Sequence, residues 1–340
     1  MITASPGARL TRPETGTMPD WRQLWRDSVT DAGELLALLG LESLAERLPP
    51  ADAGFALRVP RGFVARMRHG DARDPLLLQV LPQLAELDEV PGFVTDAVGD
   101  MASRAAQGVL HKYHGRALLI ASGSCAINCR YCFRRHFPYG DEMAAAGQWR
   151  QALEHLRHDS SISELILSGG DPLALATSKL EELSHGLAAI PHVTRLRIHT
   201  RLPVVLPERI DASFLSWLGA LPLQKVVVLH ANHANELDAS VEAACARLHD
   251  AGVTLLNQSV LLRGVNDDGG VLAELSERLF AVGVLPYYLH QLDRVQGTAH
   301  FEVDDARAQA LVDTLRARVP GYLVPKLVRE VGGDLSKRPL

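Results

Sequence analysis

Six short apolar runs, separated by stretches of helical periodicity, constrain the fold of this chain more than any other feature. All six are rich in Leu, Val and Ile. They cover residues 116–122, 164–170, 195–201, 225–232, 253–261 and 284–290. Near-continuous apolar strands that alternate with helices are typical of a parallel sheet covered on both faces. A full barrel needs eight such units, so six predict an α/β fold with a partial, TIM-like (β/α)6 barrel.

Polar residues close five of these runs. The closing sequences are Ser-Gly-Gly-Asp (168–171), His-Thr-Arg (199–201), His-Ala-Asn-His (230–233), Asn-Gln-Ser (257–259) and Leu-His-Gln-Leu-Asp (289–293). Barrels of this class build their active sites at the carboxyl ends of the strands. We therefore expect the five segments to form one polar mouth.

The chain before residue 106 lacks this alternation. Apolar residues recur there at helical spacing over 21–41, 60–70 and 74–87, and the last stretch is interrupted at Pro82. Gly70 stands where the second of these helices would end. We expect a disordered tail over residues 1–20, a helical N-terminal domain over 21–105, the barrel over 106–322 and a C-terminal segment over 323–340.

Composition and charge exclude several classes of function. The formal net charge is −5, with 35 Lys and Arg against 40 Asp and Glu, whereas a nucleic-acid surface needs clustered cations. No run approaches the roughly 20 apolar residues that span a bilayer, and the first residues lack the apolar core of a signal peptide. Three of the four cysteines fall within eight residues. This clustering favours a metal site in a reducing cytoplasm over a disulfide framework.

The clustered cysteines are Cys125, Cys129 and Cys132, which have the spacing C-x3-C-x2-C just after the first strand. Thiolates favour iron–sulfur clusters and zinc. A structural zinc ion takes four ligands. His136 is the candidate for a fourth ligand, because Cys245 lies in a helical pattern that is typical of a buried thiol. Three thiolates on a four-iron cluster would instead leave one iron open for catalysis.

With Tyr131 directly before the third cysteine, the motif resembles the signature of radical S-adenosylmethionine (SAM) enzymes. The resemblance implies that the open iron of a [4Fe-4S] cluster binds SAM and that reduction cleaves SAM to methionine and a 5′-deoxyadenosyl radical. The same superfamily has the partial-barrel fold. The resemblance places seven residues near SAM: Tyr131, Ser168, Gly169, Gly170, Asp171, His230 and Gln258. A single histidine at a strand end is otherwise more often structural.

The resemblance narrows to the lysine 2,3-aminomutase family from about residue 90 onward. The segments that carry it are 129–137, 167–173, 202–210, 230–236, 252–267, 285–293 and 321–330. The helical leader and residues 111–119 most resemble the bacterial branch that serves elongation factor P. This implies conversion of (S)-α-lysine to (R)-β-lysine, an electron-donor protein, and a ligase that attaches β-lysine to elongation factor P.

The resemblance also implies pyridoxal 5′-phosphate (PLP) held by a lysine. The chain has five lysines: Lys112, Lys179, Lys225, Lys326 and Lys337. Lys337 follows Gly332-Gly333, as the family's PLP lysine follows a glycine-containing stretch, although a lysine here is otherwise an ordinary solvated one. Lys112, Tyr113 and Arg116 are implied around the cofactor. Lys112 departs from the arginine of free-lysine aminomutases, so a bidentate phosphate contact becomes a point-charge contact.

The substrate has two charged ends that the resemblance assigns to residues. Arg134 is similar to the family's carboxylate-binding arginine, with Arg135 as the alternative. Asp293 and Glu330 fall where the ε-ammonium is bound, and Glu330 is one methylene longer than the family's Asp. Without the resemblance, both acids would be read as surface carboxylates.

Three alternatives remain at this point. The chain could act on free lysine for catabolism, on another amino acid, or serve as a non-catalytic iron–sulfur or zinc module. Catabolic aminomutases continue well beyond the PLP lysine with a segment that helps assembly, whereas this sequence ends three residues after Lys337. We therefore expect a monomer or a homodimer.

Overall fold

The computed structural model describes residues 20–50, 55–147 and 149–340. The tail expected to be disordered lies outside these residues, apart from Asp20, which caps the first helix. Ten strands form one sheet whose spatial order follows the sequence from β1 to β10. Six central strands are mutually parallel: β3 (Arg116–Ser122), β4 (Glu164–Gly169), β5 (Arg195–Thr200), β6 (Gln224–His230), β7 (Thr254–Val260) and β8 (Leu285–His290). The six predicted strands and the α/β class are confirmed.

Short strands extend this parallel sheet at both edges. β1 (Arg104–Ala106) and β2 (Val109–Tyr113) precede β3 as antiparallel neighbours. β9 (Lys326–Arg329) runs parallel to β8, and β10 (Arg338–Pro339) returns antiparallel to β9. Among the described residues no backbone ladder joins β1 or β2 to β9 or β10. The barrel is therefore open along a seam between these two edges.

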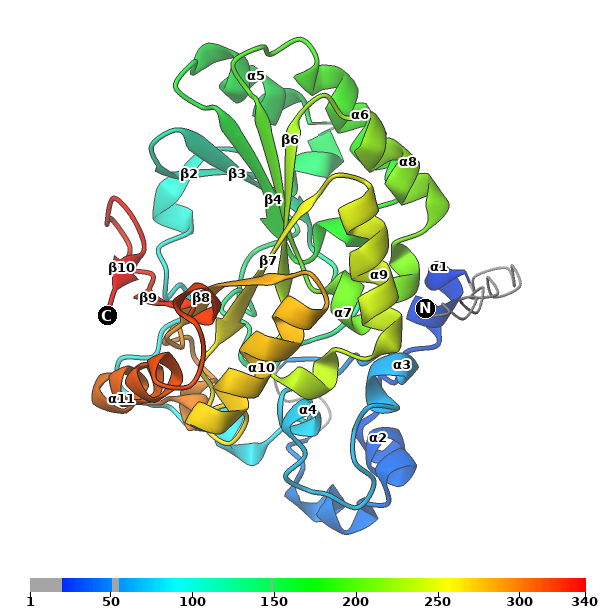
Figure 1. The fold of residues 1–340 in the computed structure, drawn as a ribbon, viewed down its shortest axis with the longest axis vertical. Helices are drawn as coiled ribbons and strands as arrows, with labels where there is room; N and C mark the ends of the chain where they lie inside the picture. The colour runs from blue at the N-terminus through cyan, green and yellow to red at the C-terminus, as the bar shows by residue number, and fades with distance from the viewer. Residues whose placement is uncertain (1–19, 51–54, 148) are drawn as a thin grey trace, which may run out of the picture.

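Helices that follow the strands cover the outside of the sheet (Figure 1). They are α5 (Arg150–His158), α6 (Thr177–Leu187), α8 (Ala212–Ala220), α9 (Ala239–Asp250), α10 (Gly269–Ala281) and α11 (Asp305–Arg316). The short α7 (Leu202–Val205) instead lies at the carboxyl end of β5, where Val205 lines the central cavity. In α9, Val241, Ala244, Cys245 and Leu248 are buried at the i, i+3, i+4, i+7 positions that face the sheet. Cys245 is thus a core thiol. Within the described part of the chain, no helix combines the length and apolarity needed to cross a membrane.

The N-terminal region is less helical than its periodicity predicts. The stretch 21–41 forms two helices, α1 (Trp21–Arg26) and α2 (Ala32–Leu39). The break has a tertiary cause, because Val29 pairs its backbone N–H and C=O with Val59 at 2.9 Å each. Asp31 then caps α2 by accepting a hydrogen bond from the Glu34 amide at 2.7 Å.

The next two predicted helices are also short. The helix expected over 60–70 is only α3 (Arg61–Val64), so Gly70 does not end it. The stretch 74–87 contains α4 (Pro75–Leu78), which Asp74 caps, and a 3-10 turn after Pro82 (Leu84–Leu87). These short elements pack many of their apolar side chains into the same core as the barrel.

Candidate active site

A cavity of about 360 Å³ lies among the carboxyl ends of the strands. The two alternatives from the sequence, Arg135 and His136, are not among the residues that line it, whereas all the residues first assigned to the cluster, SAM, PLP and the substrate are: Lys112, Tyr113, Arg116, Cys125, Cys129, Tyr131, Cys132, Arg134, Ser168, Gly169, Gly170, Asp171, His230, Gln258, Asp293, Glu330 and Lys337. The expected polar mouth is therefore present. The geometry brings these residues together, and their individual roles stay predictions.

The three clustered cysteines occupy the loop that follows β3. All are free thiols that line the cavity. Burial raises the pKa of the Cys125 thiol well above its ordinary value and that of Cys132 to about 11, with the neighbouring cysteines adding to both. Metal ligation needs the thiolate form, and a bound metal centre supplies the positive charge that favours this form in a buried loop. A soft metal cluster therefore fits this loop, and the buried Cys245 in α9 is not part of it.

Arg201 at the end of β5 is a site residue to which the sequence gave no role. Its Nη1 donates to Cys129 Sγ and to the Tyr131 hydroxyl, both at 2.7 Å. Glu236, which is fully buried, pairs with Arg201 Nη2 at 2.8 Å. His230 Nε2 lies 3.0 Å from the same Tyr131 hydroxyl. Arg201 thus brings positive charge to the cysteine loop, and the network fixes the Tyr131 ring.

The glycine-rich loop after β4 packs directly against the cysteine loop. Gly169 has φ +114°, and a Cβ there would lie 2.6 Å from the Ser122 carbonyl oxygen. A Cβ on Gly170 would lie 2.7 Å from the Ser124 carbonyl oxygen. Only glycine allows this approach. The two loops can therefore act as one surface against a ligand.

Asp171 ends the glycine-rich loop with its side chain turned toward β5. Its carboxylate accepts hydrogen bonds from the Thr200 hydroxyl at 2.7 Å and from the Arg201 and Leu202 amides at 2.7 and 3.1 Å. Burial raises the pKa of Asp171 to about 6 despite these bonds. The structure therefore shows Asp171 joining two loops of the cavity wall.

A chain of five charged residues crosses the rest of the cavity. Arg134 donates to Asp100 at 2.6 Å, and Lys112 contacts the other Asp100 oxygen at 2.6 Å. Lys112 also pairs with Glu330 at 2.9 Å, and Lys337 pairs with the second Glu330 oxygen at 2.6 Å. Lys112 lies on β2 and Glu330 directly follows β9, so this ion pair spans the seam of the open barrel. Asp100 was not predicted, since nothing in its local sequence marks it.

The charges in this chain stabilise one another. Burial opposes ionisation of Glu330, but Lys337 and Lys112 outweigh it and lower its pKa to about 2. Burial likewise opposes ionisation of Asp100, and Arg134 and Lys112 lower its pKa below the ordinary value. Both acids are therefore anions near neutral pH, and they hold the three cations in place.

Asp293 behaves differently from these two acids. Burial, with Glu330 adding to it, raises the pKa of Asp293 to about 7. Among the described residues its carboxylate accepts no hydrogen bond, yet it lines the cavity. An unpaired carboxyl group of this kind is available to a cation that enters the cavity.

The positions of the lysines show which of them can reach a ligand in the cavity. Of the five, only Lys112 and Lys337 line the cavity, whereas Lys179 pairs with Glu182 on the surface. Next to Lys112, the Arg116 guanidinium lies 4.6 Å from the centre of the Tyr113 ring. The Lys337 ammonium lies 5.8 Å from the centre of the Tyr288 ring. One end of the cavity is therefore cationic and aromatic, which suits an anionic aromatic cofactor.

Comparison with known proteins places this site in a family. A family model described as "4Fe-4S single cluster domain" matches residues 114–191. The chain is 49% identical over 335 residues to the L-lysine 2,3-aminomutase of Escherichia coli (strain K12), covering 98% of each chain. It is 46% identical over 319 residues to the Haemophilus influenzae enzyme of the same name, covering 94% of each.

More distant proteins match as well. The L-lysine 2,3-aminomutase of Clostridium subterminale is 32% identical over 324 residues, which cover 94% of this chain and 77% of that protein. A solved radical SAM methyltransferase from Sphaerobacter thermophilus has a TM-score of 0.47 and 18% identity, over 67% of this chain and 70% of that one. On the strength of its near full-length relatives, the chain belongs to the L-lysine 2,3-aminomutase family.

Proposed function

We propose that this chain is a radical SAM, PLP-dependent L-lysine 2,3-aminomutase that converts (S)-α-lysine to (R)-β-lysine. The observation that carries the proposal is one continuous cavity lined both by the three-cysteine loop and by Lys337. The close relatives of the same name support the substrate.

The cofactors fit the residues that line the cavity. Cys125, Cys129 and Cys132 would hold a [4Fe-4S] cluster with one open iron, and the surface formed with the glycine-rich loop would hold SAM beside it. Lys337 would hold PLP, with Lys112 and Arg116 on its phosphate. When bound, the cluster with SAM supplies one-electron chemistry, and PLP supplies the electrophilic carbon through which nitrogen moves between adjacent carbons.

Arg134 is the residue we assign to the substrate carboxylate. Its Nε donates to Asp100 at 2.6 Å and its Nη1 donates to the Ser168 hydroxyl at 3.1 Å. These two bonds fix the plane of the guanidinium group. A planar, oriented guanidinium presents its remaining N–H groups to a carboxylate at little entropic cost.

Asp293 and Glu330 are the residues we assign to the ε-ammonium group. Asp293 has an unpaired carboxyl group among the described residues, whereas Glu330 is held by Lys112 and Lys337. If PLP engaged Lys337, that side chain would no longer be available to Glu330, and the released Glu330 oxygen would be open to the substrate ammonium group. Glu330 would therefore bind the substrate only after the cofactor has been loaded.

We further propose the cellular setting of the reaction. The product would pass to a ligase that acts on elongation factor P, and an electron-donor protein in the cytoplasm would reduce the cluster. The enzyme would be a monomer or a homodimer. These assignments depend on the family resemblance of the helical leader and of residues 111–119.

An anaerobic assay tests the proposal. The chain is reconstituted with iron, sulfide and PLP, mixed with SAM, dithionite and (S)-lysine, and analysed for β-lysine and its chirality. We expect (R)-β-lysine from the wild type and none from Cys129→Ser. If 5′-deoxyadenosine forms without β-lysine, the substrate is wrong. If neither forms although the cluster is complete, the proposed function is overturned.

A further inference from the structure

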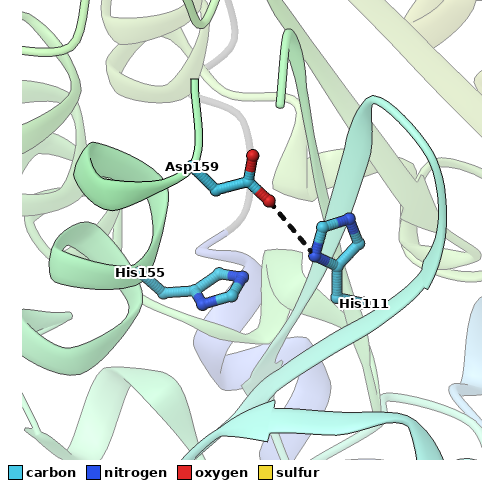
Figure 2. Close-up of side chains that lie close together, drawn as sticks. All are labelled: His111, His155 and Asp159. Atoms are coloured by element: carbon cyan, nitrogen blue, oxygen red, sulfur yellow. Dashed lines mark ion pairs between the residues drawn. The ribbon is translucent and has the colours of Figure 1, made fainter. Parts of the chain in front are cut away.

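Two histidines and an aspartate converge between β2 and the end of α5 (Figure 2), and none of them lines the cavity. His111 comes from β2, His155 from the last turn of α5, and Asp159 is the C-cap of that helix. One potential ligand atom from each residue lies within 4.8 Å of the other two. The rings of His111 and His155 meet edge to face with their centres 5.6 Å apart.

The position of His111 follows from strand geometry. Successive side chains of a strand point to opposite faces, and Leu110 and Lys112 line the cavity. His111 therefore projects outward, where Figure 2 shows it facing α5. The pairing of β2 with β3 is irregular between Leu110 and Tyr113. Strand pairing thus secures β2 least at the point where His111 meets the helix.

The donor atoms of this cluster are poorly satisfied by the protein. His155 Nε2 is buried and has no hydrogen-bond partner among the described residues. His111 Nδ1 lies 3.8 Å from Asp159 Oδ2, which is too long for a hydrogen bond. The Ser161 hydroxyl donates to the other oxygen, Asp159 Oδ1, at 2.6 Å and orients the carboxylate. A buried unpaired nitrogen is unusual in a folded protein and calls for a partner.

The protonation states suit a cation. Burial, with His111 adding to it, lowers the pKa of His155, so the ring is neutral and can ligate. Hydrogen bonds from Ser161 lower the pKa of Asp159, so it is an anion. The carbonyl groups at the end of α5 also favour positive charge at this point.

We propose that His111, His155 and Asp159 form a binding site for a divalent transition metal of the zinc class, which pins β2 to the end of α5. Imidazole nitrogen and carboxylate oxygen are ligands that zinc binds at about 2.1 Å, so tetrahedral donors lie about 3.4 Å apart. The three donor atoms are up to 4.8 Å apart in the structure, and rotation of the side chains would bring them to this tetrahedral spacing. Water completes the coordination, because the cluster is partly exposed. This site is separate from the cysteine loop and does not depend on the proposed function.

Zinc itself is the probe that tests the proposal. The full chain is first loaded anaerobically with its iron–sulfur cluster, so that the cavity cysteines are engaged, and is then stripped of loosely bound metal. Zinc affinity is measured by competition with a chromophoric chelator, and zinc per chain by elemental analysis after desalting. We expect one tightly held zinc ion in the wild type. We also expect slower hydrogen exchange of the β2 amides when zinc is present.

Substitutions locate the ion. His155→Ala and His111→Ala should each weaken zinc binding by at least about 100-fold, because loss of an outer-shell partner alone costs about 10–100-fold. The matched control is His158→Ala, an exposed histidine on the same helical turn that bonds only the Glu154 carbonyl within the described structure; it should bind like the wild type. The cluster absorbance shows that each variant is folded.

Three outcomes would overturn the site. The wild type could bind no zinc more tightly than His155→Ala does, the affinity could fall with His158→Ala instead, or zinc could bind without slowing exchange in β2. The first two outcomes remove the metal site. The third shows an adventitious ion that does not pin the strand.

Discussion

Replacing Asp100 with Asn would remove the anion that joins Arg134 to Lys112 in the buried chain of charges. The Asp100 side chain is 2% exposed and contacts both cations at 2.6 Å. Removing one partner of a buried ion pair costs about 3–5 kcal/mol, because the remaining charge is left desolvated. Arg134 keeps its bond to Ser168, and Lys112 keeps Glu330. We therefore expect Asp100→Asn to lower the free energy of unfolding by about 3 kcal/mol, at the lower end of that range.

Urea unfolding of the cofactor-free chain measures this loss at pH 7 from the shift in midpoint. The matched control is Asp334→Asn, which removes the partner of the exposed Arg338 at 3.0 Å and should cost no more than about 1 kcal/mol. Arg134 and Lys112 lower the pKa of Asp100, so its contribution is complete above its ordinary pKa of 3.8. The difference in unfolding free energy between the wild type and Asp100→Asn should then become smaller as the pH falls below about 4.

A second measurement connects the same change to the cofactor. PLP should raise the midpoint of Asp100→Asn more than that of the wild type, because its phosphate would replace the lost anion beside Lys112. The reasoning fails if Asp100→Asn lowers the free energy of unfolding no more than Asp334→Asn does. The ion pairs of the cavity would then not contribute to stability.

Three further changes test single residues of the site. Lys337→Ala should abolish the visible absorbance of bound PLP and leave the iron–sulfur spectrum intact; retained PLP absorbance would assign the cofactor to another lysine. Cys129→Ser should prevent assembly of a four-iron cluster, whereas Cys245→Ser should keep full iron content, as iron analysis of reconstituted protein would show. Burial, with Glu330, holds the pKa of Asp293 at about 7 against 3.8 ordinarily, so its ionisation destabilises the fold as pH rises from about 4 to 7. Asp293→Asn should therefore unfold at higher urea than the wild type at pH 8 yet lose lysine binding; equal midpoints at that pH would contradict the assigned burial.

The barrel was predictable because its strands are locally encoded. Leu165, Ile166 and Leu167 are buried on both sides of β4, and such runs are typical of parallel strands that helices cover on both faces. The parallel direction then places every strand end at one mouth. Residues as distant in sequence as Ser168 and Asp293 could be assigned to one cavity for this reason alone.

The features that the sequence did not predict depend on tertiary contacts, which leave no local pattern in the sequence. Asp100 and Arg134 are 34 positions apart, and neither sequence neighbourhood indicates the pairing. Arg201 was seen at a strand end, but its bond to Cys129 crosses 72 positions. The break between α1 and α2 likewise depends on the pairing of Val29 with Val59. Helical periodicity predicts which face is buried, but it does not predict where a partner strand interrupts the helix.

The seam of the barrel links binding in the cavity to local opening of the chain. Lys112 and Glu330, which close it, are 218 positions apart, so their contact closes one of the longest loops in the molecule and gains no help from chain connectivity. Segments with few ladder bonds and non-local closing contacts are the first to open in native-state fluctuations. An anionic ligand held between the two edges would bind only the closed form and would suppress that fluctuation. Affinity for such a ligand and protection of the seam amides from exchange are then two measures of a single equilibrium.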